Sequence, residues 1–128
     1  MSIQITPIGY VSTQAENVPP FYTISDVKGK IVIDDKYKIG IQDIQPGSEI
    51  LVVFQFHKSP EFSENHLRII PRGGGRKVGI FSTRSPVRPN PIGVSVLIVT
   101  AVKGNTLTVK NLDMLDGTPV LDIKPVVT

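Results

Sequence analysis

The sequence predicts an all-β protein, a small β-barrel of about seven strands with short helical turns. Two observations support this fold class. No segment keeps the 3.6-residue apolar period of an amphipathic helix, and short strand-like runs are separated by turn-forming residues. Strands of this length and spacing are typical of barrels and sandwiches. The predicted strands are Ile3–Ile8, Lys30–Ile33, Tyr37–Ile41, Glu49–Phe56, Lys77–Thr83, Gly93–Val102 and Thr106–Leu112.

The individual runs differ in how they face the core. Glu49–Phe56 (EILVVFQF) is almost entirely apolar, which predicts a strand covered on both faces. Thr106–Lys110 alternates polar and apolar residues, so one of its faces should meet solvent. Lys103-Gly104-Asn105 supplies turn residues, so Gly93–Leu112 should form a hairpin. Single helical turns are expected near Ile41–Ile44 and Leu121–Ile123.

Length and composition restrict the class of protein. At 128 residues the chain has the size of one domain, and its 40% hydrophobic content is that of a folded globular protein. It contains no cysteine, which excludes disulfides and thiolate chemistry. It shows no apolar run near the ~18 residues of a membrane span and no secretory leader at Met1–Tyr10. We therefore expect a single domain over residues 1–128 that is cytoplasmic and makes no membrane contact.

Positive charge is concentrated in one segment. Residues 57–91 carry seven basic and two acidic side chains, and they hold all five arginines of the chain. A clustered set of guanidinium groups is typical of a surface that meets phosphates, although solvated charges on a long loop would give the same pattern. Within this segment Ser85–Gly93 (SPVRPNPIG) has three prolines, so it should be stiff before any ligand binds.

Several common catalytic patterns are missing. Gly73-Gly74-Gly75 is followed by Val78 where a dinucleotide-binding loop needs glycine, and no G-K-[ST] sequence follows. His57 and His66 are the only histidines and lack the spacing of a metal site, so we expect hydrogen-bonded structural residues and no metal. No nucleophile elbow is present.

Three carboxylates lie close together near the C-terminus. Asp113, Asp116 and Asp122 occur within ten residues. They are either turn residues that accept backbone amide bonds or, with the arginines, part of a site of mixed charge. The residues alone favour neither interpretation.

Two long segments resemble a known family. Gly79–Gly93 (GIFSTRSPVRPNPIG) and Asp113–Pro125 (DMLDGTPVLDIKP) are similar to the TsaA/TrmO-like family, and Pro7–Val11 and Phe54–His57 fit it more loosely. Members of that family are S-adenosylmethionine-dependent tRNA methyltransferases that methylate the exocyclic N6 of threonylcarbamoyladenosine beside the anticodon. The resemblance implies a small β-barrel, S-adenosylmethionine as cofactor, tRNA as substrate and a homodimer.

The resemblance also implies site residues. Those that match cofactor-contacting positions, or the stiff loop beside them, are Pro20, Phe21, His57, Lys58, Arg84, Arg88, Asn90, Val94, Lys110, Asn111, Leu112 and Asp113. The sequence departs from the family at Val126, where many members have an aromatic residue, and it ends at Thr128 where some members continue into a second domain. We expect a short form without that domain.

Methyl transfer to an acylated adenine nitrogen requires a base, because the nitrogen must lose its proton. Asp113, Asp116, Asp122 and His57 are the candidates, and Asp113 is preferred over Asp116. We expect Asp113, Arg84 and Asp122 to be catalytic, and Arg68, Arg72, Arg76 and Lys77 to contact tRNA phosphates. The alternatives are a non-catalytic RNA-binding barrel and a regulatory barrel that binds S-adenosylmethionine.

Overall fold

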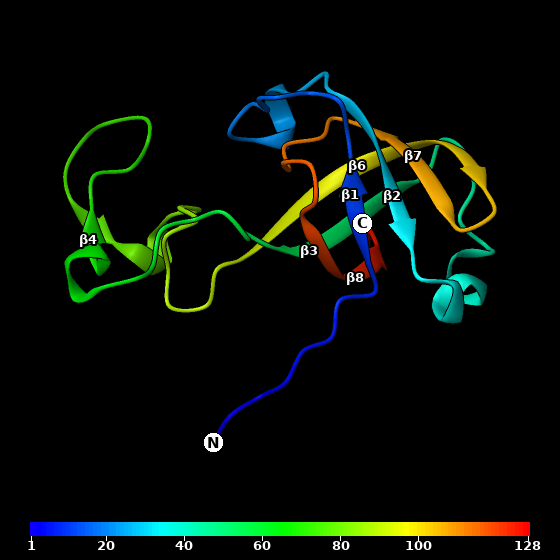
Figure 1. Cartoon of the computed structure of the whole chain (residues 1–128). Helices are drawn as coiled ribbons and strands as arrows, with labels where there is room; N and C mark the ends of the chain where they lie inside the picture. The colour runs from blue at the N-terminus through cyan, green and yellow to red at the C-terminus, as the bar shows by residue number, and fades with distance from the viewer.

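The computed structural model describes all 128 residues, Met1–Thr128. Six antiparallel strands close a barrel in the order β1-β2-β7-β6-β3-β8. Figure 1 shows this barrel with a long excursion on one side. The strands are β1 (Gly9–Ser12), β2 (Lys28–Ile33), β3 (Glu49–Gln55), β6 (Ile92–Lys103), β7 (Thr106–Lys110) and β8 (Pro119–Pro125). The expected all-β barrel is confirmed, with six strands in the barrel.

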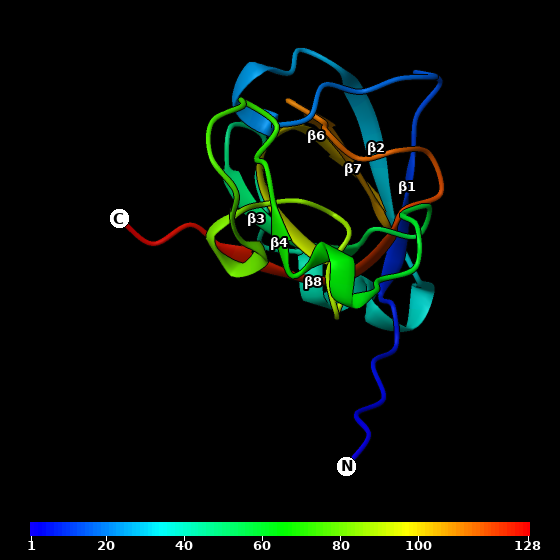
Figure 2. The ribbon, with the colours of Figure 1, turned by 90° about the vertical axis from the view of Figure 1, so that its left-hand side faces the viewer.

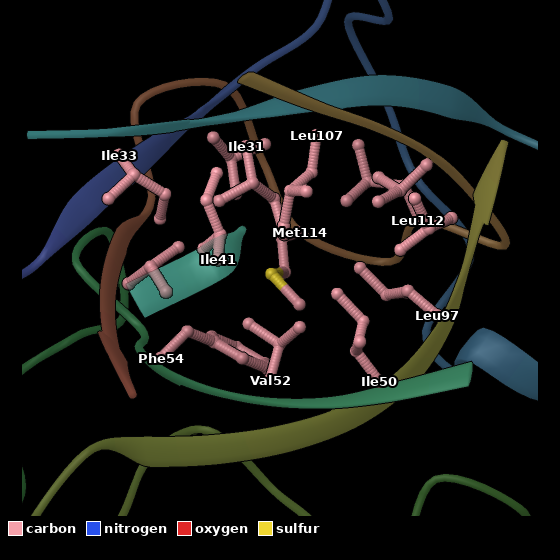
Figure 3. Close-up of a cluster of buried hydrophobic side chains, with 14 residues drawn as sticks. Ile31, Ile33, Ile41, Ile50, Val52, Phe54, Leu97, Leu107, Leu112 and Met114 are labelled. Carbon is pink, nitrogen blue, oxygen red and sulfur yellow. The ribbon is translucent and has the colours of Figure 1, made fainter. Parts of the chain in front are cut away.

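Inward-facing side chains fill the barrel. Alternate residues of β3 and β6 point inside, and Ile50, Val52, Leu97 and Val99 are at most 3% exposed. Met114, which follows β7, places its thioether at the centre of the same cluster (Figure 3). Burial of 14 such residues supplies the main driving force for folding, at roughly 25 cal/mol per Å² of apolar surface.

The predicted β6–β7 hairpin is confirmed. Lys103 pairs with Thr106 across Gly104, whose φ of 60° lies in the left-handed region that glycine adopts without strain. β3 pairs with β6 on one side and β8 on the other. Its residues alternate between buried and partly exposed, so only one face is fully buried and the predicted cover on both faces is wrong.

Other strand predictions are wrong. Tyr37–Ile41 lies in the 3₁₀-helix η2 (Asp35–Ile41), of which only Ile41 is buried. Ile3–Ile8 precedes β1 and forms no strand. The barrel is already closed, so its strands offer no free edge to Tyr37–Ile41, and within Ile3–Ile8 only Ile8 bonds to the barrel, through Val120 and Asp34. The helical turn expected at Leu121–Ile123 is instead part of β8, the strand that closes the barrel between β1 and β3.

Between β3 and β6 the chain leaves the barrel. We call residues 57–91 the arm; in Figure 1 it extends away from the barrel, and in Figure 2 it lies in front of it. The arm contains η3 (Glu64–His66), β4 (Arg68–Ile69), β5 (Val78–Gly79) and η4 (Ile80–Ser82). The strand predicted over Lys77–Thr83 is therefore limited to two residues, which pair with β4.

The arm is held by its own contacts. Ile80 is 1% exposed and its backbone amide donates to the Leu67 carbonyl over 2.9 Å. His66 Nδ1 accepts the Ser63 amide over 3.0 Å, which confirms the structural role expected for this histidine. The short η1 (Tyr22–Ile24) lies before β2. No helix of the structure is long and apolar enough to span a bilayer.

Candidate functional site

A cleft of about 1110 Å³ lies between the arm and the adjacent end of the barrel. The loop Val18–Phe21 and residues Ile69–Gly73 of the arm line it, and the remaining lining comes from the end of β3 and the residues after it, from η4 and from the loop after β7. A smaller hollow of about 190 Å³ adjoins it and shares Phe21, Phe54, Arg84 and Asp113 with it.

Asp113 is the carboxylate of this cleft. Its side chain is half-buried, and its Oδ1 accepts a hydrogen bond from Ser95 Oγ over 2.7 Å. Burial raises the pKa of Asp113 above its usual value, while Ser95, the backbone amides of Asp113 and Tyr22, and the charge of Arg84 oppose this rise. A carboxylate with a raised pKa in a cleft is a common feature of catalytic sites.

The backbone after β7 delivers Asp113 to the cleft. Asn111 has a φ of 69°, a left-handed conformation that asparagine tolerates better than most residues. Leu112 then enters the core, and its amide donates to the Val27 carbonyl over 3.0 Å. Met114 is also buried, so Asp113 lies between two residues that are anchored in the barrel.

Arg84 supplies a cation to the same cleft. Its guanidinium donates to the Val94 carbonyl over 3.1 Å, and Val94 is the residue before Ser95 in β6. Two adjacent residues of one strand therefore hold the cation and the carboxylate. Arg88 donates to the carbonyls of Thr83 and Ser85, so it stabilises the proline-rich loop.

Aromatic rings form an apolar part of the cleft. Phe54 and Phe56 meet edge to face with ring centroids 5.0 Å apart, and both line the cleft with Phe21. Both rings lie against Gly93, where an added Cβ would stand 2.6 Å from Phe54 and 2.7 Å from Phe56. Glycine at position 93 therefore allows the close packing of the two rings.

The structure brings most predicted cofactor positions to the cleft or to the hollow beside it. Pro20, Phe21, His57, Lys58, Arg84 and Asp113 line it, and Arg88 and Val94 line the adjoining hollow. The other predicted positions lie elsewhere. Leu112 is part of the core, and Lys110, Asn111 and Asn90 are not among the residues that line either cavity.

The three aspartates are separated. Asp116 Oδ1 accepts the Thr13 amide over 2.9 Å, which fits the turn-residue interpretation of this aspartate. Asp122 lies on β8, accepts its neighbour Ile123's amide and forms an ion pair with Lys124 over 2.7 Å. Asp122 is absent from the lining of the cleft, so the geometry supports only Asp113 as its carboxylate.

The four residues predicted to contact nucleic acid are all exposed on the arm, but they differ in position. Arg68 donates to the Lys77 carbonyl over 3.2 Å within the β4–β5 pair, and Arg76 and Lys77 precede β5. Arg72 lines the cleft.

Sequence reasoning missed Ser95 and the arm wall Ile69–Gly73. Ser95 could have been found from the two-residue alternation of β6. It shares the inward face with Leu97 and Val99 and is the one hydroxyl on that face. No cluster of three or more histidine, cysteine, aspartate or glutamate side chains that could hold a metal ion occurs in the structure.

Comparison with known proteins places the chain in a family. Residues 12–128 match the model of the tRNA-methyltransferase O N-terminal domain. A protein of Pyrococcus abyssi named as a probable S-adenosyl-L-methionine-binding protein is 37% identical over 94% of this chain and 66% of its own length. The human tRNA (adenine(37)-N6)-methyltransferase is 34% identical over 93% of this chain and 29% of its own length.

A solved structure gives the same result. The crystal structure of TrmO from Pseudomonas aeruginosa superposes with a TM-score of 0.73 at 27% identity, covering 99% of this chain and 57% of that one. The chain thus spans only part of the length of these relatives. Sequence match and fold agree, and the chain belongs to the tRNA-methyltransferase O N-terminal domain family.

Proposed function

We propose that this protein is an S-adenosylmethionine-dependent tRNA methyltransferase that methylates the exocyclic N6 of an adenine. The observation that carries the proposal is that Arg84 and Asp113 lie in the same cleft. Val94 of β6 holds the first by a hydrogen bond, and the next residue, Ser95, holds the second. Relatives named as S-adenosyl-L-methionine-binding proteins and as tRNA (adenine(37)-N6)-methyltransferases support it.

The side chains of the cleft fit the proposed cofactor. S-adenosylmethionine, when bound, supplies an electrophilic methyl group on a sulfonium. The rings of Phe21 and Phe56 suit stacking with an adenine, and the Arg84 guanidinium suits a carboxylate. Ligand pockets usually measure roughly 300–1000 Å³, so a cleft of about 1110 Å³ has room for a cofactor and a second base.

Asp113 is the base in this proposal. Its carboxylate would accept the proton that the adenine N6 loses as the nitrogen attacks the methyl group. A raised pKa suits this role, because a general base works best when its pKa lies near the working pH. The cleft also has to hold nitrogen and methyl carbon about 3–3.5 Å apart and in line, and a stiff wall favours such positioning. The prolines of Ser85–Gly93 supply that stiffness.

For the substrate we propose threonylcarbamoyladenosine beside the anticodon. Its threonyl group carries a carboxylate, and Arg72 is a cleft arginine for which the structure shows no hydrogen-bond or ion-pair partner. Arg68, Arg76 and Lys77 extend the positive charge along the arm, where they suit phosphates of the surrounding tRNA.

We also propose that the protein acts as a homodimer in the cytoplasm, as expected from the sequence. Leu67, Ile70 and Phe81 are 45%, 58% and 75% exposed, all three lie on the arm, and Ile70 and Phe81 also border the cleft. An apolar set of this kind on a projecting element suits a protein interface. Light scattering should give twice the chain mass, and Phe81→Ser should lower it toward the monomer. A monomeric native protein would contradict the dimer.

The experiment for the function is methyl transfer from tritiated S-adenosylmethionine to bulk tRNA, followed by nucleoside analysis. The proposal predicts label in an N6-methylated adenosine derivative, and its threonylcarbamoyl form if the substrate is as proposed. Cofactor binding without transfer would instead indicate the regulatory barrel, and tRNA binding without cofactor binding would indicate the RNA-binding barrel.

A further inference from the structure

Ser95 is a buried polar residue at the cleft end of β6. Its side chain is 1% exposed, whereas the inward residues that follow it, Leu97 and Val99, are apolar and fully buried. A hydroxyl in such surroundings costs stability unless it forms a hydrogen bond. Packing therefore does not explain a serine at this position.

The hydroxyl of Ser95 has one partner, the Asp113 carboxylate. Ser95 Oγ donates to Asp113 Oδ1 over 2.7 Å, a length typical of a hydrogen bond to an ionised oxygen. Ser95 is the only side chain that donates a hydrogen bond to this carboxylate in the structure. The backbone of Ser95 is fixed in turn, because β6 pairs with β3 at Val52 and continues to Val94, which accepts the Arg84 guanidinium.

We propose that Ser95 is a positioning residue that fixes the orientation of the Asp113 carboxylate and stabilises its ionised form. The proposal rests on the proposed function, in which Asp113 accepts the substrate proton. Oδ1 is held by Ser95, and Oδ2 has no side-chain partner, so Oδ2 is the oxygen that would take the proton from the substrate.

Other groups around Asp113 act on the same equilibrium. Its charged and titratable neighbours across the cleft and the adjoining hollow are Tyr22, His57, Lys58, Arg72, Arg84 and Arg88. Among them the charge of Arg84 favours the ionised carboxylate, and burial opposes it. Ser95 differs from these groups because it acts by a direct hydrogen bond and carries no charge, so its removal leaves the net charge of the cleft unchanged.

The test compares native protein with Ser95→Ala. The first measurement is the titration of the Asp113 carboxyl carbon by NMR, without cofactor or tRNA, assigned with Asp113→Asn. The second is the pH dependence of methyl transfer to tRNA. Ser95→Ala should move the Asp113 titration and the acid limb of the rate profile to higher pH, because the ionised form loses its donor. The rate on that limb should fall about tenfold, with a smaller change on the plateau.

Two further variants separate positioning from general loosening. Val99→Ala removes buried volume from the same strand without touching Asp113, so it should lower the melting temperature and leave both pH curves in place. Ser95→Cys keeps a similar size with a weaker donor, so its curves should lie between those of native protein and Ser95→Ala. The cysteine variant also decides the question if the alanine variant does not fold.

The proposal is overturned if the Asp113 titration of Ser95→Ala and Ser95→Cys has the same midpoint as that of native protein. It is also overturned if Val99→Ala moves this midpoint as far as Ser95→Ala does. The NMR titration needs no enzymatic activity. A protein that fails to methylate tRNA but shows the displaced titration would refute the proposed function and leave the Ser95–Asp113 link standing.

Discussion

The backbone amide of Thr13 donates to Asp116 Oδ1 over 2.9 Å, although the two residues lie 103 positions apart. This bond ties the segment after β1 to the turn before β8. It gives Asp116 a structural task, three residues from the carboxylate that lines the cleft. Two neighbouring aspartates therefore have different roles, and their variants should behave differently.

Asp116→Ala should lower the free energy of unfolding by about 1 kcal/mol, because the Thr13 amide loses its acceptor. Asp116→Asn keeps an oxygen at the same place and should change stability less. Denaturant unfolding of both variants measures the effect. Equal stability of native protein and Asp116→Ala would mean that the bond contributes nothing.

Asp113 should make stability depend on pH in the opposite direction to an ion-paired aspartate. Burial raises the folded-state pKa of Asp113, so between its ordinary value and the raised value the folded state binds more protons than the unfolded state. The free energy of unfolding therefore falls as the pH rises through this window. Below the ordinary pKa of an aspartate, Asp113 is protonated in both states and the free energy of unfolding no longer depends on its titration. Asp113→Asn lacks this dependence, so its stability relative to native protein should increase from acid to neutral pH. Thermal unfolding across the pH range measures this, and a relative stability that decreases would contradict the burial.

The exposed cations of the arm should govern the salt dependence of tRNA binding. Replacing Arg68, Arg76 and Lys77 with alanine should reduce the slope of log K against log salt by about 2 units, taking roughly 0.7–0.9 per lost phosphate contact. A control with the same change in net charge replaces Lys36, Lys38 and Lys103 at the end of the barrel opposite the arm (Figure 1). Its slope should stay near that of native protein, and equal slopes in the two triple variants would remove the arm from the tRNA interface.

Cofactor binding should stabilise the fold. S-adenosylmethionine at ~100 times its dissociation constant should add about 2.7 kcal/mol to the free energy of unfolding. We expect micromolar affinity, equivalent to about −8 kcal/mol. Arg84→Ala should weaken binding, because it removes a cation from the cleft, whereas Lys38→Ala on η2 should not. Calorimetry and thermal unfolding of the three proteins check this, and absence of both heat and a thermal shift with native protein would contradict cofactor binding.

The sequence predicts the barrel because its interior strands carry strong local patterns. The apolar run of β3 and the alternation of β7 each specify a strand without knowledge of the rest of the fold. Tyr37–Ile41 also alternates, but a strand needs an open edge to pair with, and closure of the barrel removes every edge. Such a constraint depends on the whole topology and cannot be read from a short segment.

The sequence likewise predicts only part of the candidate site. Arg84 and Asp113 are found from motifs, since each lies within a long, distinctive segment. The residues that hold them, Val94 and Ser95, cannot be found from motifs. Their hydrogen bonds to Arg84 and Asp113 depend on how the loops pack against β6. The position of Arg72 on the cleft wall depends in the same way on the fold of the arm.

Single-turnover methyl transfer to tRNA by Asp113→Asn, at saturating cofactor, tests the central claim most directly. The variant keeps the shape of the side chain and an acceptor for Ser95 but cannot take up a proton at neutral pH. The account predicts a rate at least ~10²-fold below that of native protein, the size expected when a general base is lost, with cofactor affinity within a few fold and no loss of melting temperature. A rate equal to that of native protein, or a loss of rate that merely follows a loss of fold, would contradict the assignment of Asp113 as the base.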